Sequence, residues 1–152
     1  MYTGSALGLL SAADICLRAG QNLCQRYRDI RGTHRCLDDL GIRVENVWMD
    51  IASQIGTVAS SFEGIPDNLR GSMTSDLCRL KFCLHTAYRN LEKVTDQKGC
   101  TPIKAMKFAL FLKRSLKKDV SVLEKWRDRF ATTFSLYLNP SRVLPILANE
   151  TP

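Results

Sequence analysis

The chain is 152 residues long, a length that suits one domain with a self-sufficient core. Hydrophobic residues make up 45% of it and charged residues 24%, a composition that excludes an intrinsically disordered protein. The net charge of +7 favours anionic partners, such as lipid headgroups or nucleic acid.

The start of the chain predicts a cytoplasmic protein. Residues 1–10 carry no basic segment, and the apolar run 6–13 stops at Asp14, so neither a secretory signal nor a spanning helix is expected. The six cysteines are therefore expected to be reduced and to serve as small core residues. They are Cys16, Cys24, Cys36, Cys78, Cys83 and Cys100.

The first predicted helix covers about residues 4–31. Its core-facing positions step alternately by four and three residues, at Leu9, Ala13, Cys16, Gly20, Leu23, Tyr27 and Ile30. Gly32 is a good residue to end this helix, and Thr33 is a good cap for the next one.

Small residues form a second pattern on the same helix. They recur at every fourth position, at Gly4, Gly8, Ala12, Cys16, Gly20 and Cys24. Such a ridge lets another helix approach closely, in a soluble bundle or in a bilayer. Glycine costs about 1 kcal/mol relative to alanine inside a helix, so Gly8 and Gly20 need a reason, and close packing is the simpler one.

Three further helices follow in chain order. The second has the clearest apolar stripe, from Leu37 to Phe62, and the cluster 63–68 predicts a turn after it. The third carries a stripe from Met73 to Val94 and is closed by Gly99.

The fourth helix begins at the cap and proline of residues 101–102 and ends at Asn139-Pro140. Its stripe slips in phase between residues 110 and 116, which predicts a kink or a break. Short links between long helices predict an all-α, up-down bundle of about four helices over residues 1–138, with an irregular tail over 139–152.

The sequence contains no recognisable catalytic pattern. Glycines are scattered, and no GxSxG, HExxH or ExxH motif occurs, so we expect no enzyme, no catalytic residue and no cofactor. A zinc site from His34 and Cys36 with Cys83 and His85 is disfavoured, because residues two apart on a helix point in different directions. No metal is expected.

The excess positive charge lies in one segment. Residues 98–129 hold ten of the 22 basic residues but only three of the 15 acidic ones, so the remaining chain has twelve of each. Lys113, Arg114, Lys117 and Lys118 share a helix face and are the candidate lipid-binding residues. A nucleic-acid partner is disfavoured, because four nearby aromatic residues are expected mostly on the apolar stripe rather than between the charges. These are Phe108, Phe111, Trp126 and Phe130.

Three stretches together resemble the fungal HeLo and HeLo-like family of cell-death domains. They are the opening GSALGLLSAAD of residues 4–14, the run RVENVW of residues 43–48, and LKKDVSVLEKWRDRF of residues 116–130. The same architecture resembles the four-helix executioner domain of animal necroptosis. The resemblance departs at Asp14, which interrupts the apolar start, and in the tail, where no amyloid-like repeat occurs.

The resemblance implies a function and a site. It implies a domain that executes regulated cell death in fungal incompatibility and innate immunity, by permeabilising membranes after oligomerisation through a downstream amyloid-motif or receptor module. It also implies that the first helix enters the bilayer. By position this maps onto Gly4, Leu7, Gly8, Leu9 and Ala12.

The expected partners are anionic membrane lipids, further copies of the chain and the downstream region, with relocation from the cytoplasm to the plasma membrane on activation. Two other interpretations stay open. One is a homotypic or heterotypic protein-interaction module with no membrane activity. The other is a nucleic-acid binder that uses the basic segment.

Overall fold

A computed structural model describes residues 3–32, 35–95 and 102–138. It contains four long helices and one short 3-10 helix, and no strand occurs among those residues. The elements are α1 (Thr3–Asp29), α2 (Arg35–Ser60), η1 (Phe62–Gly64), α3 (Asp67–Thr95) and α4 (Pro102–Leu138). The prediction of an all-α helical bundle is confirmed.

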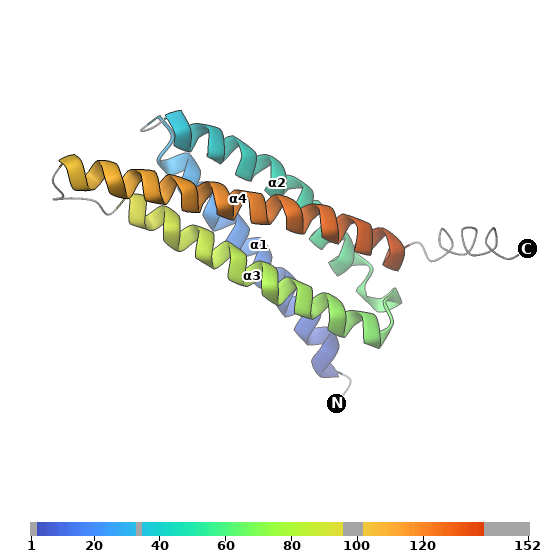
Figure 1. Cartoon of the computed structure of the whole chain (residues 1–152). Helices are drawn as coiled ribbons and strands as arrows, with labels where there is room; N and C mark the ends of the chain where they lie inside the picture. The colour runs from blue at the N-terminus through green and yellow to red at the C-terminus, as the bar shows by residue number, and fades with distance from the viewer. Residues whose placement is uncertain (1–2, 33–34, 96–101, 139–152) are drawn as a thin grey trace, which may run out of the picture.

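The helices pack around one core in the order α1, α2, α4, α3 (Figure 1). α1 packs on α2 and α3, and α4 packs on the same two helices. α1 and α4 therefore lie diagonally across the bundle from each other. Their outward-facing sides are therefore on opposite sides of the bundle.

The core is built from the predicted apolar stripes. Each long helix contributes large side chains with little or no exposed surface, among them Leu9, Leu23, Ile51, Ile55, Leu77, Leu84 and Leu116. Burying one such side chain stabilises the fold by about 2 kcal/mol relative to leaving it in water. No polar or charged side chain is buried among the described residues.

Gly20 lets α1 and α2 approach closely. A Cβ atom at this position would overlap the indole ring of Trp48, which belongs to α2 and is itself buried. Close packing in the bundle therefore accounts for Gly20. Gly8 is different, because a Cβ atom there would lie 3.9 Å from Cγ2 of Thr74, an ordinary contact.

The helix ends largely follow the predicted signals. Gly32 has a φ of 89°, a left-handed conformation in which glycine avoids the cost that a side chain would incur. After α2, Arg70 fixes η1 by donating hydrogen bonds of 3.1 and 2.9 Å to the Phe62 carbonyl. Thr33, Gly99 and the tail 139–152 lie outside the described residues, so their predicted roles stay predictions.

The last helix does not have the predicted break, whereas the alternative of a kink stays a prediction. α4 runs as one helix from Pro102 to Leu138. The phase slip arises at Leu110, which is 59% exposed and does not share the buried side of Leu116, Val120 and Leu123. Leu110 is therefore an outward-facing apolar residue and not the core residue that the periodicity predicts.

Candidate functional site

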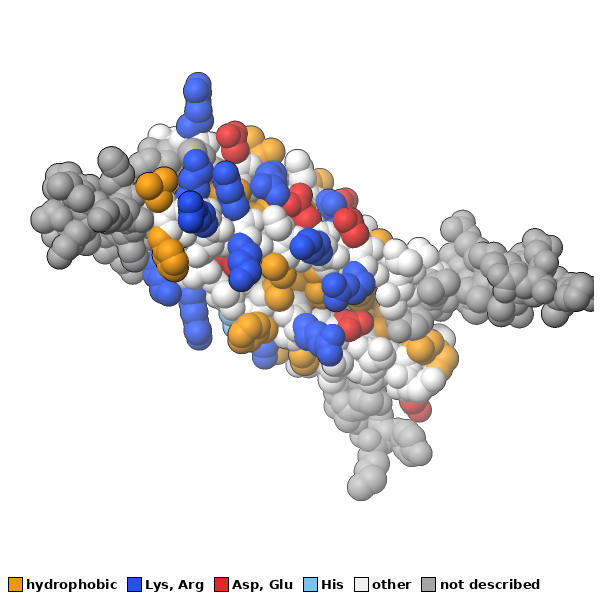
Figure 2. All heavy atoms as spheres, in the orientation of Figure 1, with side chains coloured by type: hydrophobic (Ala, Val, Ile, Leu, Met, Phe, Trp, Pro, Cys, Tyr) orange, Lys and Arg blue, Asp and Glu red, His pale blue; other side chains and the backbone are white. Residues whose placement is uncertain are grey.

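One face of α4 carries basic and apolar side chains in a single row, which we call the outer stripe. Its members follow one another at spacings of three or four residues, so they share one side of the helix. They are Phe111, Arg114, Lys118, Val122, Lys125 and Arg129, all exposed. Figure 2 shows this side of the bundle, with lysine and arginine side chains over α4 and hydrophobic side chains among them.

The basic members of the outer stripe have no ion-pair partner among the described residues. The neighbouring side of α4, which packs on α2, is different. There Arg127 lies 3.5 Å from Asp50, and Glu124 pairs with Arg43. Acidic partners therefore neutralise the flank of α4, whereas the charges of its outer stripe remain available to an external anion.

The four predicted lipid-binding residues all lie on α4, in two settings. Arg114, Lys117 and Lys118 are exposed, and Lys113 is half-buried on the side nearer the core. Three of the four can thus meet a surface without any change in the bundle. Sequence reasoning missed Val122, Lys125 and Arg129 as members of the same face, although their spacing from Lys118 was visible.

The prediction that the nearby aromatic side chains avoid the charged face is partly wrong. Phe130 is buried and stacks on Trp126 with ring centroids 4.5 Å apart, as expected of stripe residues. Phe111, however, is 67% exposed and lies one helical turn before the exposed Arg114, and Phe82 of α3 is 72% exposed. The side chain of Phe108 lies outside the described residues. The aromatic argument against nucleic acid therefore loses part of its basis.

The predicted insertion residues lie in α1, away from the basic face. Leu9 has no exposed surface and Ala12 is buried, while Gly8 is half-buried. Gly4 and Leu7 belong to α1, but their side chains lie outside the described residues. The bundle thus keeps the described part of this segment packed on its neighbours rather than exposing it.

Two cysteines of α1 report on the packing of that helix. The Sγ atom of Cys16 donates a hydrogen bond of 3.0 Å to the Leu77 carbonyl, and burial raises the pKa of this thiol to about 12. Burial, and then the charge of Glu45, raises the pKa of the Cys24 thiol to about 11. Both are free thiols, as are Cys78 and Cys83, whereas the side chains of Cys36 and Cys100 lie outside the described residues.

Neither a metal cluster nor a membrane-spanning helix is found in the described part of the chain. No three histidine, cysteine or acidic side chains there lie close enough together to hold an ion. No helix there has an apolar stretch long enough to cross a bilayer.

Comparisons with known proteins identified no relative of this chain. No family model matches the chain, and neither a curated protein nor a solved structure matches it. The resemblance to the HeLo family accordingly stays a prediction, carried by the three sequence stretches alone.

Proposed function

We propose that this bundle docks on anionic membrane surfaces through the outer stripe of α4 and the adjacent Lys117. The observation that carries the proposal is the row of ion-pair-free basic side chains interleaved with exposed apolar ones. Each basic residue near an anionic leaflet contributes about 1 kcal/mol. An exposed aromatic ring beside them can enter the headgroup region, where such rings are favoured.

Docking is proposed as the first of two steps. In the second, a downstream region gathers several copies, α1 leaves the bundle, and its apolar start permeabilises the bilayer. Release of α1 exposes buried side chains such as Leu9 at a cost of about 2 kcal/mol each, so it needs the bilayer as an alternative apolar environment. The cell-death role of this step rests on the family resemblance.

Leakage of dye from vesicles tests both steps. The monomer and a form oligomerised by a fused coiled coil are each mixed with vesicles of neutral lipid alone or with added anionic lipid. We expect both forms to bind the anionic vesicles and only the oligomer to release the dye. Absence of binding by either form contradicts the proposal, and so does equal binding to neutral vesicles.

A reversible lock isolates the second step. The Gly8→Cys and Thr74→Cys pair lies where α1 and α3 are in ordinary contact, so a disulfide can hold the two helices together, with Cys78→Ser removing an exposed thiol. The oxidised oligomer is expected to dock without leakage and to regain leakage on reduction. Leakage by the oxidised form contradicts release of α1.

A protein-interaction module is the second candidate. Ile42 and Met49, seven residues apart on α2, are 48% and 71% exposed, so α2 presents two large apolar side chains to the exterior of the bundle. Sedimentation without lipid tests this candidate. The protein-interaction module is favoured if the protein self-associates, if Met49→Ser abolishes this self-association and if no lipid binding occurs. The nucleic-acid interpretation is favoured if the protein binds oligonucleotides in a salt-dependent way and binds no lipid.

A further inference from the structure

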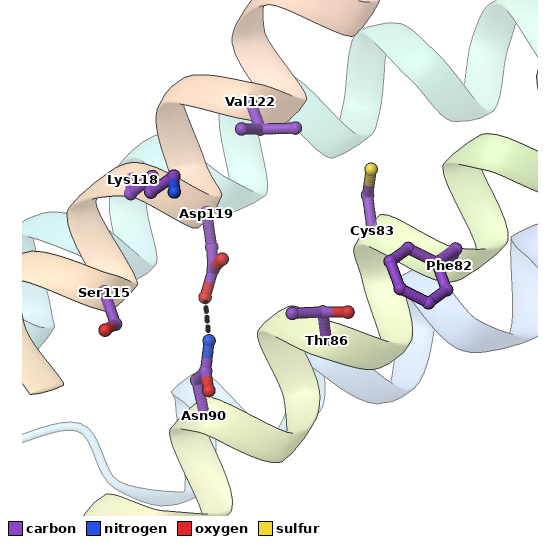
Figure 3. Close-up of a pocket in the computed structure, with 8 residues that line it drawn as sticks. All are labelled: Phe82, Cys83, Thr86, Asn90, Ser115, Lys118, Asp119 and Val122. Atoms are coloured by element: carbon purple, nitrogen blue, oxygen red, sulfur yellow. Dashed lines mark hydrogen bonds between the residues drawn. The ribbon is translucent and has the colours of Figure 1, made fainter.

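A groove between α3 and α4 adjoins the outer stripe. It has a volume of about 290 Å³ and is shown in Figure 3. α3 contributes Phe82, Cys83, Thr86 and Asn90, and α4 contributes Ser115, Lys118, Asp119 and Val122. Lys118 and Val122 belong to both the groove and the outer stripe, so a surface that meets the stripe also meets the mouth of the groove.

The groove contains a carboxylate, that of Asp119, which forms no ion pair with any described side chain. The side chain of Asp119 is half-buried, and its Oδ2 atom accepts a hydrogen bond of 2.7 Å from Nδ2 of Asn90 (Figure 3). Burial raises the pKa of this carboxyl, while the bond from Asn90 and the charge of Lys118 act in the opposite direction. A half-buried carboxylate whose only direct partner is a neutral amide is stabilised by an added cation.

The remaining lining suits a ligand with charges of both signs. Lys118 is exposed at the rim, and the hydroxyl groups of Ser115 and Thr86 can donate to anionic oxygens. Phe82, whose ring is 72% exposed, lines the opposite end of the groove from Asn90 and Asp119 and adds apolar surface there (Figure 3). Asp119 would repel a ligand that carries only negative charge, and Lys118 would form no favourable contact with a ligand that carries only positive charge.

We propose that this groove takes the headgroup of an anionic phospholipid that also carries an ammonium group, as in phosphatidylserine, with the ammonium on Asp119 and the phosphate toward Lys118. The inference rests on the proposed docking of α4 on membranes, and it names the lipid class that docking prefers. Phosphatidylglycerol has the same net charge without an ammonium, so it can use the outer stripe but not Asp119.

Charge-matched vesicles test the assignment. Vesicles of phosphatidylcholine with equal mole fractions of phosphatidylserine or phosphatidylglycerol are titrated with the protein. We expect roughly tenfold tighter binding to phosphatidylserine, the scale of one charge-assisted hydrogen bond. Equal binding to the two vesicles overturns the assignment and leaves the proposed docking intact, whereas binding to neither overturns both.

Two isosteric variants place the preference in the groove. Asp119→Asn keeps an acceptor for Asn90 and removes the charge, so the preference for phosphatidylserine should vanish while phosphatidylglycerol binding stays equal or rises. Asp128→Asn removes an exposed carboxylate from α4 outside the groove and should keep the preference. Persistence of the preference in a folded Asp119→Asn protein overturns the assignment.

A soluble headgroup distinguishes a lipid surface from a free ligand. The side-chain amide resonance of Asn90 is followed by NMR while glycerophosphoserine or glycerophosphoglycerol is added. Only glycerophosphoserine should shift this resonance. The concentration needed should be far above that of lipid in the vesicle experiment, because a free headgroup does not contact the outer stripe. An equal shift with both compounds overturns the role of the ammonium group.

Discussion

Helices α1 and α4 each carry a feature that suggests contact with membranes, but the bundle treats the two features in opposite ways. Four small residues of α1 are buried, namely Ala12, Cys16, Gly20 and Cys24, and Gly20 lies directly against the Trp48 ring of α2. The basic residues of the outer stripe of α4 face outward and form no ion pair among the described residues, whereas Arg127 on the flank of α4 pairs with Asp50. The small residues of α1 are therefore inaccessible in the folded bundle, whereas the outer stripe of α4 can contact a membrane surface without a conformational change.

The diagonal placement of the two helices adds a constraint. When the outer stripe of α4 lies on a surface, α1 is on the far side of the bundle (Figure 1). An intact bundle therefore cannot dock through α4 and insert α1 at the same time. In the proposed function, docking and insertion are therefore separate steps, which the following variants distinguish.

The largest expected effect compares one substitution at two positions. Leu9→Ala on α1 removes a fully buried side chain and should lower the free energy of unfolding by about 2–5 kcal/mol. Leu110→Ala on α4 should change it by no more than about 0.5 kcal/mol, because that side chain is 59% exposed. Chemical denaturation measures both. Equal losses would mean that α4 is not outward-facing at this position.

The second effect concerns charge. Neutralising Lys113, Arg114, Lys117 and Lys118 together should weaken binding to anionic vesicles by up to about 4 kcal/mol, with the fold retained. The matched control neutralises Arg18, Arg28, Arg31 and Arg35, which are exposed on and just after α1 and at the start of α2. Both variants lose the same net charge. If the control loses as much affinity, total charge decides binding rather than the α4 face.

The third effect has opposite signs at two glycines of α1. Gly20→Ala forces the Trp48 ring to move and should destabilise the bundle by about 1–3 kcal/mol. Gly8→Ala meets only an ordinary contact with Thr74 and should stabilise the helix by up to about 1 kcal/mol. Thermal unfolding measures both shifts. A stable Gly20→Ala protein would contradict the close approach of α1 and α2.

The smallest effect is a pH dependence that comes from the thiols of α1. The folded pKa values of about 12 for Cys16 and 11 for Cys24 exceed the ordinary value of 9.0, so the unfolded chain releases these protons first. The contribution of each thiol to stability is complete below pH 9.0 and is lost as the pH rises toward its folded value. The slope is at most about 1.4 kcal/mol per pH unit for each thiol.

Denaturation at several alkaline pH values measures this slope, and Cys24→Ala should reduce it. The same thiols report on α1 in the docked state. Reagents should label Cys78 quickly and Cys16 slowly in the docked monomer, and Cys16 should become reactive in the oligomer on vesicles. Rapid labelling of Cys16 in the free monomer would show that α1 is not packed as described.

The fold could be predicted because hydrophobic spacing alone identifies the buried side of each helix. Residues such as Leu23, Ile55 and Leu84 lie in the core where their periodicity placed them. The order of the helices around the core could not be predicted in this way, because an apolar stripe shows which side of a helix is buried but not which helix packs against it. The diagonal relation of α1 and α4 is therefore a structural finding.

The candidate site was predictable only in part. The spacing of the basic residues along the helix predicts that Lys118 lies on a charged face. Hydrophobicity alone predicts that Phe111 faces the core, because the sequence does not distinguish a buried apolar side chain from an exposed one. The groove could not be predicted at all. Asn90 and Asp119 are 29 residues apart on different helices, and no local pattern brings an amide to a carboxylate.

The central claim is that the intact bundle meets the membrane through α4 with α1 facing away. An environment-sensitive fluorescent amino acid is placed at Phe111 of α4 or, in a matched protein, at Ile15 of α1, both of which are exposed. The monomer is then bound to vesicles that contain phosphatidylserine. The account predicts a blue shift and quenching by lipid-attached quenchers at position 111 and no change at position 15. A blue shift at position 15 with none at position 111 would contradict it.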